Sequence, residues 1–146
     1  MLIVISNKTF KRWFLKKLFT LKKFSNIIMH TVNIKIKFIY KVCSQKDWVK
    51  AISSNIFKGT GIDLIDNFIH FSTQDQLKET LRIHFKGKKN LFLIKVDCKD
   101  INIVWEKARN SQYFPHLYGN LNLDKVVGIY PLKVSSNGSH ILPSLI

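Results

Sequence analysis

An imidazole and a hydroxyl stand two residues apart at His70 and Ser72, inside an otherwise apolar stretch. In an extended chain alternate side chains point to the same face, so these groups share one face with Phe68. A buried polar group without a hydrogen-bond partner costs about 1–3 kcal/mol. The pattern therefore leaves two interpretations, in which both groups are satisfied within a core or both line a cleft.

A carboxyl group directly follows a large aromatic residue at Trp105-Glu106, where a strand is expected to end. Beside an apolar wall a carboxyl group can have a raised pKa, which suits proton transfer or the binding of ribose hydroxyls. The same position is equally typical of a solvated strand end. Glu106 is therefore a candidate catalytic residue with a structural alternative.

Residues 114–119 bring together a proline, an imidazole, a phenol and a glycine. Proline and glycine make a loop rigid, and rigid loops often carry functional side chains. We expect a loop that presents His116 and Tyr118, with His116 as a candidate for proton exchange. In the alternative interpretation the loop closes the core with Phe114 and Tyr118.

The net charge of +15 resembles that of a nucleic-acid-binding protein, but the charge is unevenly distributed. Residues 1–46 contain eleven Lys or Arg and no acidic residue, whereas residues 47–146 contain thirteen basic and nine acidic residues. Only three of the basic residues are arginine, which is the side chain best suited to reading bases through paired hydrogen bonds. No sequence-specific nucleic-acid partner is predicted.

The two cysteines, Cys43 and Cys98, lie far apart in strand-like apolar contexts, without the spacing of a zinc site or a disulfide framework. We expect buried, reduced thiols, no metal site and a cytoplasmic protein.

Gly59-Thr60-Gly61 is interpreted as a turn, because a single Gly-x-Gly is weak evidence for phosphate binding.

Residues 1–33 are expected to form a basic N-terminal extension, helical or disordered. Apolar residues recur at helical spacing between Phe10 and Phe24, with lysines mainly on the opposite side. An extension outside the fold, a targeting peptide and weak contact with a membrane surface through residues 1–28 all remain open. No apolar run is long enough to cross a membrane.

Residues 34–133 are interpreted as a single α+β domain, followed by a flexible C-terminal tail at 134–146. Ser44 with Asp47, and Thr73 with Gln76, are capping boxes that predict two short helices. The second helix would bury Leu77, Leu81 and Phe85 and carry His84 in its last turn, where the helix dipole favours a cation. Strands are expected at 34–42, within 63–73, and at 91–96, 102–105 and 126–132.

Several of these segments together resemble domain-of-unknown-function family 952, over about residues 38–132. The resemblance rests on Phe-Ile-His-Phe-Ser-Thr at 68–73 and Phe-Pro-His-Leu-Tyr-Gly at 114–119, in this order. That family is structurally similar to the ADP-ribosyltransferase superfamily. The resemblance implies a split antiparallel sheet with two or more short helices, and a cleft for the nicotinamide end of NAD or a related nucleotide.

By this resemblance His70 corresponds to a strand histidine that holds a ribose hydroxyl, with Ser72 beside it and Tyr118 as a stacking surface. The chain lacks the Glu-x-Glu or Gln-x-Glu pair of toxin-like transferases, so Glu106 would have to replace the single catalytic acid. The tRNA 2′-phosphotransferase branch relies on several arginines, and residues 34–133 contain only Arg82 and Arg109.

Two functions follow as hypotheses, while the oligomeric state is not addressed by the sequence. In the first, the protein is a transferase or glycohydrolase that acts on NAD or an ADP-ribose-like nucleotide, with Glu106 or His116 exchanging protons. NAD would then be a substrate, and no other cofactor is identified. In the second, the same cleft binds a nucleotide or another small molecule without catalysis.

Overall fold

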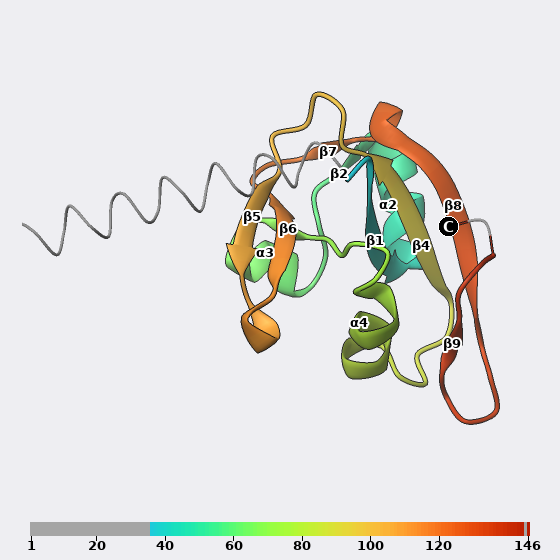
Figure 1. The fold of residues 1–146 in the computed structure, drawn as a ribbon. Coiled ribbons are helices and arrows are strands. Elements are labelled where there is room, and N and C mark those ends of the chain that lie inside the picture. The colour runs from blue at the N-terminus through green and yellow to red at the C-terminus, as the bar shows by residue number, and fades with distance from the viewer. Residues whose placement is uncertain (1–35, 145) are drawn as a thin grey trace, which may run out of the picture. The chain divides into compact units, whose positions relative to one another are not determined.

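The computed structural model describes residues 36–144 and 146, which form an α+β fold with antiparallel strands (Figure 1). The α+β class and the antiparallel pairing predicted from the sequence are thus confirmed. The elements are β1 (Phe38–Ser44), α2 (Gln45–Ser54), β2 (Ile56–Phe57), α3 (Ile62–Asp66), β3 (Ile69–His70), α4 (Leu77–His84), β4 (Leu91–Asp97), β5 (Val104–Lys107), β6 (Tyr113–Leu117), β7 (Leu121–Asn122), β8 (Val126–Val134) and β9 (His140–Ile141), with 3₁₀ turns at Arg109–Ser111 and Leu123–Lys125.

The strands form a four-stranded sheet in the order β1-β4-β8-β9, a three-stranded sheet in the order β3-β6-β5, and the pair β2-β7. Tyr40 of β1 and Ser72, just after β3, exchange backbone hydrogen bonds of 2.9 Å in each direction. The two larger sheets therefore meet at this bridge, and α4 follows it directly in the chain (Figure 1).

Helix α2 begins and ends where its capping residues predict. The Ser44 hydroxyl accepts a hydrogen bond from the Asp47 backbone N–H at 3.1 Å, and Asn55 ends the helix in the left-handed conformation. Trp48 and Ala51 are buried, one turn apart on the inner face of the helix. Ile52 lies outside this face and is 56% exposed.

Substitution Ser44→Ala is expected to lower the free energy of unfolding by about 1 kcal/mol, because it leaves the Asp47 N–H at the helix N-terminus without its acceptor. Ser44→Asn preserves an acceptor at the cap and should recover most of the loss. Urea denaturation of the three proteins measures the effect, and equal midpoints for Ser44→Ala and the wild type would contradict it.

Helix α4 begins later than predicted, at Leu77, because residues 74–76 form a turn. A hydrogen bond of the predicted capping box is present in this turn, where the Gln76 side-chain oxygen accepts from the Thr73 N–H at 3.0 Å. Leu77 and Leu81 are buried as predicted and Phe85 packs partly against them. The elements expected at 91–96, 102–105 and 126–132 correspond to β4, β5 and β8.

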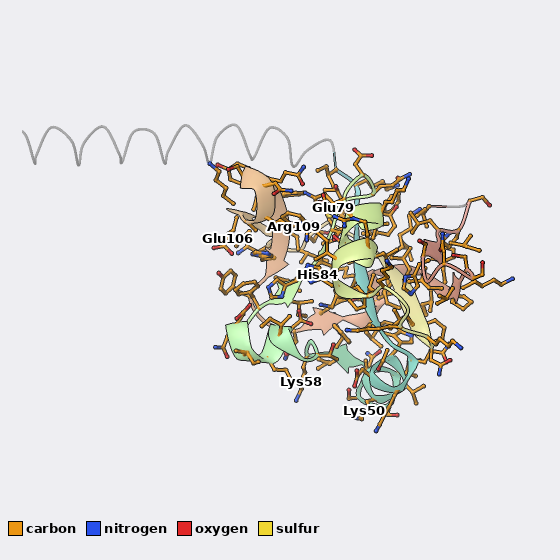
Figure 2. All side chains as sticks on the ribbon, turned by 90° about the horizontal axis from the view of Figure 1, so that it is seen from below. Lys50, Lys58, Glu79, His84, Glu106 and Arg109 are labelled. Carbon is orange, nitrogen blue, oxygen red and sulfur yellow. The ribbon has the colours of Figure 1, made fainter. Side chains whose placement is uncertain are left out.

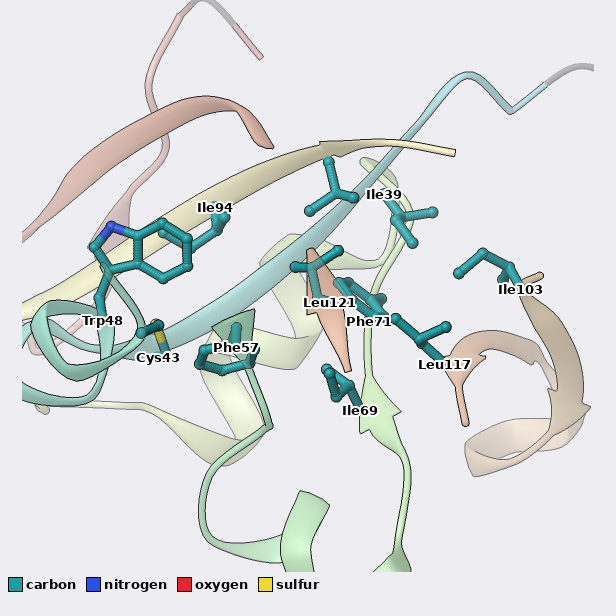
Figure 3. Close-up of a cluster of buried hydrophobic side chains, with 12 residues drawn as sticks. Ile39, Cys43, Trp48, Phe57, Ile69, Phe71, Ile94, Ile103, Leu117 and Leu121 are labelled. Atoms are coloured by element: carbon teal, nitrogen blue, oxygen red, sulfur yellow. The ribbon is translucent and has the colours of Figure 1, made fainter. Parts of the chain in front are cut away.

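Every residue of strand β1 from Ile39 to Cys43 is buried. One face of the strand packs into a cluster that joins it to α2 and the three-stranded sheet, and the other packs against α4. Lys41 is consequently buried as well. Figure 3 shows the first cluster, which includes Ile39, Cys43, Trp48, Phe57, Ile69, Phe71, Ile94, Ile103, Leu117 and Leu121.

Residues 134–146, expected as a flexible tail, include β9, which pairs with the end of β8, and Leu142 packs against the second cluster.

Cys43 is buried, whereas Cys98 is only half-buried, and both are free thiols. None of the helices in the described part of the chain is long and apolar enough to span a membrane. The predictions for residues 1–33, including membrane contact through 1–28, concern a segment that lies outside the described residues.

Helix α3 has an unusual distribution of side chains. Its buried side chain is that of Asp63, while Ile62, Leu64 and Ile65 are 56%, 59% and 73% exposed. The turn at Gly59 and Gly61 that precedes α3 confirms the interpretation of this segment, since both glycines have positive φ. A side chain at Gly59 would also collide with Asp63 at 2.6 Å.

Candidate functional site

A cleft of about 810 Å³ opens between β1 and α4 on one side and the three-stranded sheet on the other. Of the residues predicted from the sequence, His70, Ser72 and His116 line this cleft. Glu106 and Tyr118 do not line it. Glu106 is hydrogen-bonded to His116, and the Tyr118 ring packs against Phe68, a neighbour of His116. The structure thus brings the five predicted residues into one region but places only three of them on the cleft wall.

Residues 113–117 form strand β6 and not the predicted loop. The strand lies between β3 and β5, and its Pro115 and His116 are buried. Proline lacks an N–H and is uncommon in a central strand, which is why the sequence favoured a loop. The Pro115 carbonyl still accepts a hydrogen bond of 2.9 Å from the Phe71 N–H, so the pairing continues past the proline.

Glu106 holds His116 from the neighbouring strand. His116 Nδ1 lies 2.7 Å from Glu106 Oε2, and the Tyr118 hydroxyl donates to the same oxygen at 2.9 Å. The hydrogen bond from His116 lowers the pKa of Glu106 and outweighs the opposing effect of burial, and the Tyr118 hydroxyl acts in the same direction. The expectation of a raised pKa is therefore wrong, because Glu106 stands beside two donors and is partly exposed.

His116 has the environment of a neutral, oriented imidazole. Burial lowers its pKa, against the opposing hydrogen bond to Glu106. The ring stacks on Phe68 with centroids 4.4 Å apart. With Nδ1–H donated to Glu106, the lone pair of a neutral ring is on Nε2, for which no hydrogen-bond partner is found among the described residues.

His70 is half-buried and held by two carboxylates of α3. Its Nδ1 lies 2.8 Å from Asp63 Oδ1 and its Nε2 lies 3.2 Å from Asp66 Oδ2. The Ser72 hydroxyl shares a hydrogen bond of 3.0 Å with Thr80 on α4. Both interpretations of this pair therefore hold in part, because each group is satisfied within the protein and each also lines the cleft.

Asp63 is the centre of a buried polar cluster that we did not identify from the sequence. Its carboxylate accepts hydrogen bonds from Lys41 Nζ at 2.7 Å, the His70 backbone N–H at 3.0 Å and the Thr60 N–H at 2.9 Å. Burial alone would raise the pKa of Asp63, but the hydrogen bond from His70 and the charge and hydrogen bond of Lys41 lower it to about 2.

Lys41 is the other missed residue, and its signal was visible as a lysine inside the apolar stretch of β1. Burial lowers the pKa of its ammonium group, while the charge of Asp63 opposes this effect. A buried charge needs a partner of opposite sign. The sequence contained such a partner at Asp63, but without a contact map the two could not be paired.

Acid is expected to destabilise the fold through Asp63. An aspartate in the unfolded chain has a pKa of about 3.9, and in the folded protein Asp63 has a pKa of about 2. The stability that ionised Asp63 contributes is therefore fully present above pH ~4 and is lost as the pH falls towards ~2. Urea unfolding measured at intervals across this range should show the decline, and Asp63→Asn should reduce it; an equal decline in both proteins would contradict the assignment.

Arg109 lines the cleft from the 3₁₀ turn that follows β5, and its guanidinium group reaches α4. Its Nη1 lies 2.9 Å from His84 Nε2, and the group lies over the ring of Phe114 with its central carbon 5.2 Å from the centroid. Figure 2 shows Arg109 beside His84, with Glu106 farther out on the three-stranded sheet. Arg109 Nε and Nη2 are buried and have no hydrogen-bond partner among the residues that the structure describes.

His84 accepts the hydrogen bond from Arg109 and is therefore neutral at this nitrogen. Burial lowers its pKa, and the positive charges of Arg109 and Lys88 lower it further. The placement of His84 at the helix C-terminus suggested a cation stabilised by the dipole. The neighbouring Arg109 reverses this expectation.

Two other chemistries find little support within the described residues. No group of three or more His, Cys, Asp or Glu side chains there has the arrangement of a metal site. Cys43 lines the cleft, but burial raises the pKa of its thiol to about 12, so that the reactive thiolate is scarce at neutral pH.

Comparisons with known proteins identify a family and similar solved structures. A family model described as "Protein of unknown function (DUF952)" matches residues 42–129. The crystal structure of protein CC0527 from Caulobacter crescentus is 34% identical, covers 71% of this chain and 93% of its own, and superposes with a TM-score of 0.68. The solution structure of the same protein is 35% identical, with a TM-score of 0.64 and coverage of 70% and 90%. No protein with a curated description matches the chain.

Proposed function

Because the chain belongs to the DUF952 family, whose description names no activity, we propose a function from the cleft itself. The cleft binds NAD or an ADP-ribose-like nucleotide, and the protein transfers or hydrolyses the group attached to its ribose. This proposal includes the likeness to ADP-ribosyltransferases, which is supported by the two antiparallel sheets that flank the cleft.

The observation that carries the proposal is the Glu106–His116 pair. A carboxylate that accepts from Nδ1 fixes the imidazole tautomer and orients Nε2, as in other sites where a histidine acts as a base. A neutral imidazole can take a proton from water or from an acceptor hydroxyl, whose oxygen then attacks the anomeric carbon of the ribose. Nicotinamide leaves with the bonding electrons, and the proton on His116 passes to solvent.

In this proposal His116 is the catalytic residue and Glu106 is a positioning residue. Glu106 stays ionised, because its hydrogen bonds lower its pKa, and it does not line the cleft. Tyr118 is 52% exposed and supports Glu106 instead of stacking on the ligand. His70 and Ser72 line the wall, and a ribose hydroxyl bound there takes the place of the partly exposed Asp66 at Nε2 of His70.

Binding without catalysis is the second candidate, favoured by how completely the wall is satisfied. Both nitrogens of His70 contact carboxylates and the Ser72 hydroxyl contacts Thr80, so these groups form a rigid receptor surface. A protein that senses or carries a nucleotide needs these groups to form the binding surface and needs no proton transfer from them.

One experiment separates the two candidates. The purified protein is titrated with NAD and ADP-ribose by calorimetry, and the same mixtures are followed for nicotinamide release by chromatography. Saturable binding with release that disappears in His116→Gln supports the enzyme. Saturable binding without release supports the receptor, and the absence of binding by any nucleotide would overturn both.

A further inference from the structure

We propose that Arg109 forms the phosphate-binding subsite of the cleft, through the edge of its guanidinium group that carries Nε and Nη2. The inference deepens the proposed function by assigning which chemical group of the ligand is held and by which residue. Arg109 was not among the residues predicted from the sequence.

The guanidinium group is fixed on two sides and unsatisfied on the third. Its Nη1 is held 2.9 Å from His84 of α4, and its flat face lies over Phe114 of β6. The remaining atoms, Nε and Nη2, are buried without a partner in the described part of the chain. These two nitrogens carry parallel N–H bonds on one edge of the group, which is the arrangement that binds two oxygens of one phosphate or carboxylate.

A buried charged donor without an acceptor is rare in folded proteins, and each case calls for a physical reason. An oxyanion supplied by a ligand is such a reason here, because Arg109 is one of the residues that line the cleft. Arginine also loses little conformational freedom on binding when its planar group is already held in place. The contacts with His84 and Phe114 provide that restraint.

The charges around Arg109 favour phosphate over a carboxylate. Lys88 also lines the cleft, and its positive charge, like that of Arg109, acts on His84. Within the described residues neither Lys88 nor Arg109 forms an ion pair with an acidic side chain. The carboxylate among the lining residues is Asp47, which is hydrogen-bonded to Ser44 at the N-terminus of α2. Two positive charges without a neighbouring acid suit a phosphate or diphosphate better than a singly charged carboxylate.

The test compares Arg109→Lys and Arg109→Ala with the wild type and with Arg82→Ala. Arg82 is a matched control, because it lies on α4, is exposed and pairs only weakly with Glu79 at 3.7 Å. Calorimetry with ADP-ribose, inorganic pyrophosphate and acetate measures the dissociation constants, and urea unfolding confirms that each variant is folded. Arg109→Lys retains the positive charge and remains informative if the alanine variant does not fold.

We expect both Arg109 variants to bind ADP-ribose and pyrophosphate about 10- to 100-fold more weakly, with Arg82→Ala unchanged and acetate bound poorly by all four proteins. Unchanged ADP-ribose binding in both variants would overturn the subsite and leave the proposed function standing. Pyrophosphate binding that depends on Arg109, in a protein that binds no nucleotide, would support the subsite and overturn the proposed function. Equal binding by Arg109→Lys and the wild type, or tighter binding of acetate than of pyrophosphate, would contradict the paired contact with phosphate.

Discussion

Asp63→Ala is expected to lower the free energy of unfolding by about 3–5 kcal/mol, which is a large fraction of the stability of a small domain. The substitution leaves the ammonium group of Lys41 buried without its partner, since Lys41 Nζ lies 2.6 Å from the Asp63 carboxylate. It also removes the acceptor of two backbone N–H groups, those of Thr60 and His70. Breaking a buried pair from one side is far more harmful than removing both charges.

Urea denaturation of Asp63→Ala, Lys41→Met and the double variant measures this effect. The double variant should lose less stability than the sum of the two single losses, because it no longer contains an unpaired buried charge. Asp66→Ala is the matched control from the same helix, since Asp66 is partly exposed and, among the described residues, is paired with the outer nitrogen of His70. Its loss should stay below about 1 kcal/mol, and a loss equal to that of Asp63→Ala would refute the central role of Asp63.

His116→Gln is expected to reduce nicotinamide release by about 10²- to 10⁴-fold with little change in nucleotide affinity, because it removes the proposed base without opening the cleft. Glu106→Gln should reduce the rate less. It leaves the imidazole in place but no longer fixes its tautomer, and it removes an interaction that raises the pKa of His116. The pH profile of the Glu106→Gln rate should therefore shift to lower pH.

Steady-state kinetics with NAD, together with ¹H–¹⁵N spectra of the imidazole, distinguish this role from a purely structural one. Tyr118→Phe is the control, because it removes a second contact with Glu106 and leaves the contact with His116. It should change the rate by less than about tenfold. A His116→Gln protein that turns over NAD as fast as the wild type would remove His116 from catalysis.

Local signals in the sequence predicted much of the fold. The capping pair at Ser44 and Asp47 located α2, and the continuous apolar run at 91–96 located β4, because both depend on neighbouring residues. The same reasoning failed at residues 113–117, where Pro115 suggested a loop. Its neighbour β3 comes from a distant part of the chain, and the pairing with β3 and with the preceding strand β5 overrides the local preference.

The candidate site was predicted only in part for the same reason. His70, Ser72 and His116 were recognisable as polar groups in apolar surroundings, and the structure places all three on the cleft. Lys41 and Arg109 could not be assigned a role, because that role depends on Asp63 and His84, which are 22 and 25 residues away. A single sequence gives the types of such residues but not their partners.

The inverted polarity of α3 has a consequence for engineering the protein. The side chain that faces the interior is a carboxylate, and the side chains that face outward are isoleucine and leucine. The usual rule that a helix is stabilised by apolar residues on its inner face therefore does not apply at Asp63. Hydrophilic replacements at Leu64 or Ile65 should improve solubility at little cost to the fold. A designer who fills the interior of this helix with a hydrocarbon side chain at Asp63 would dismantle the ion pair on which the neighbouring strand depends.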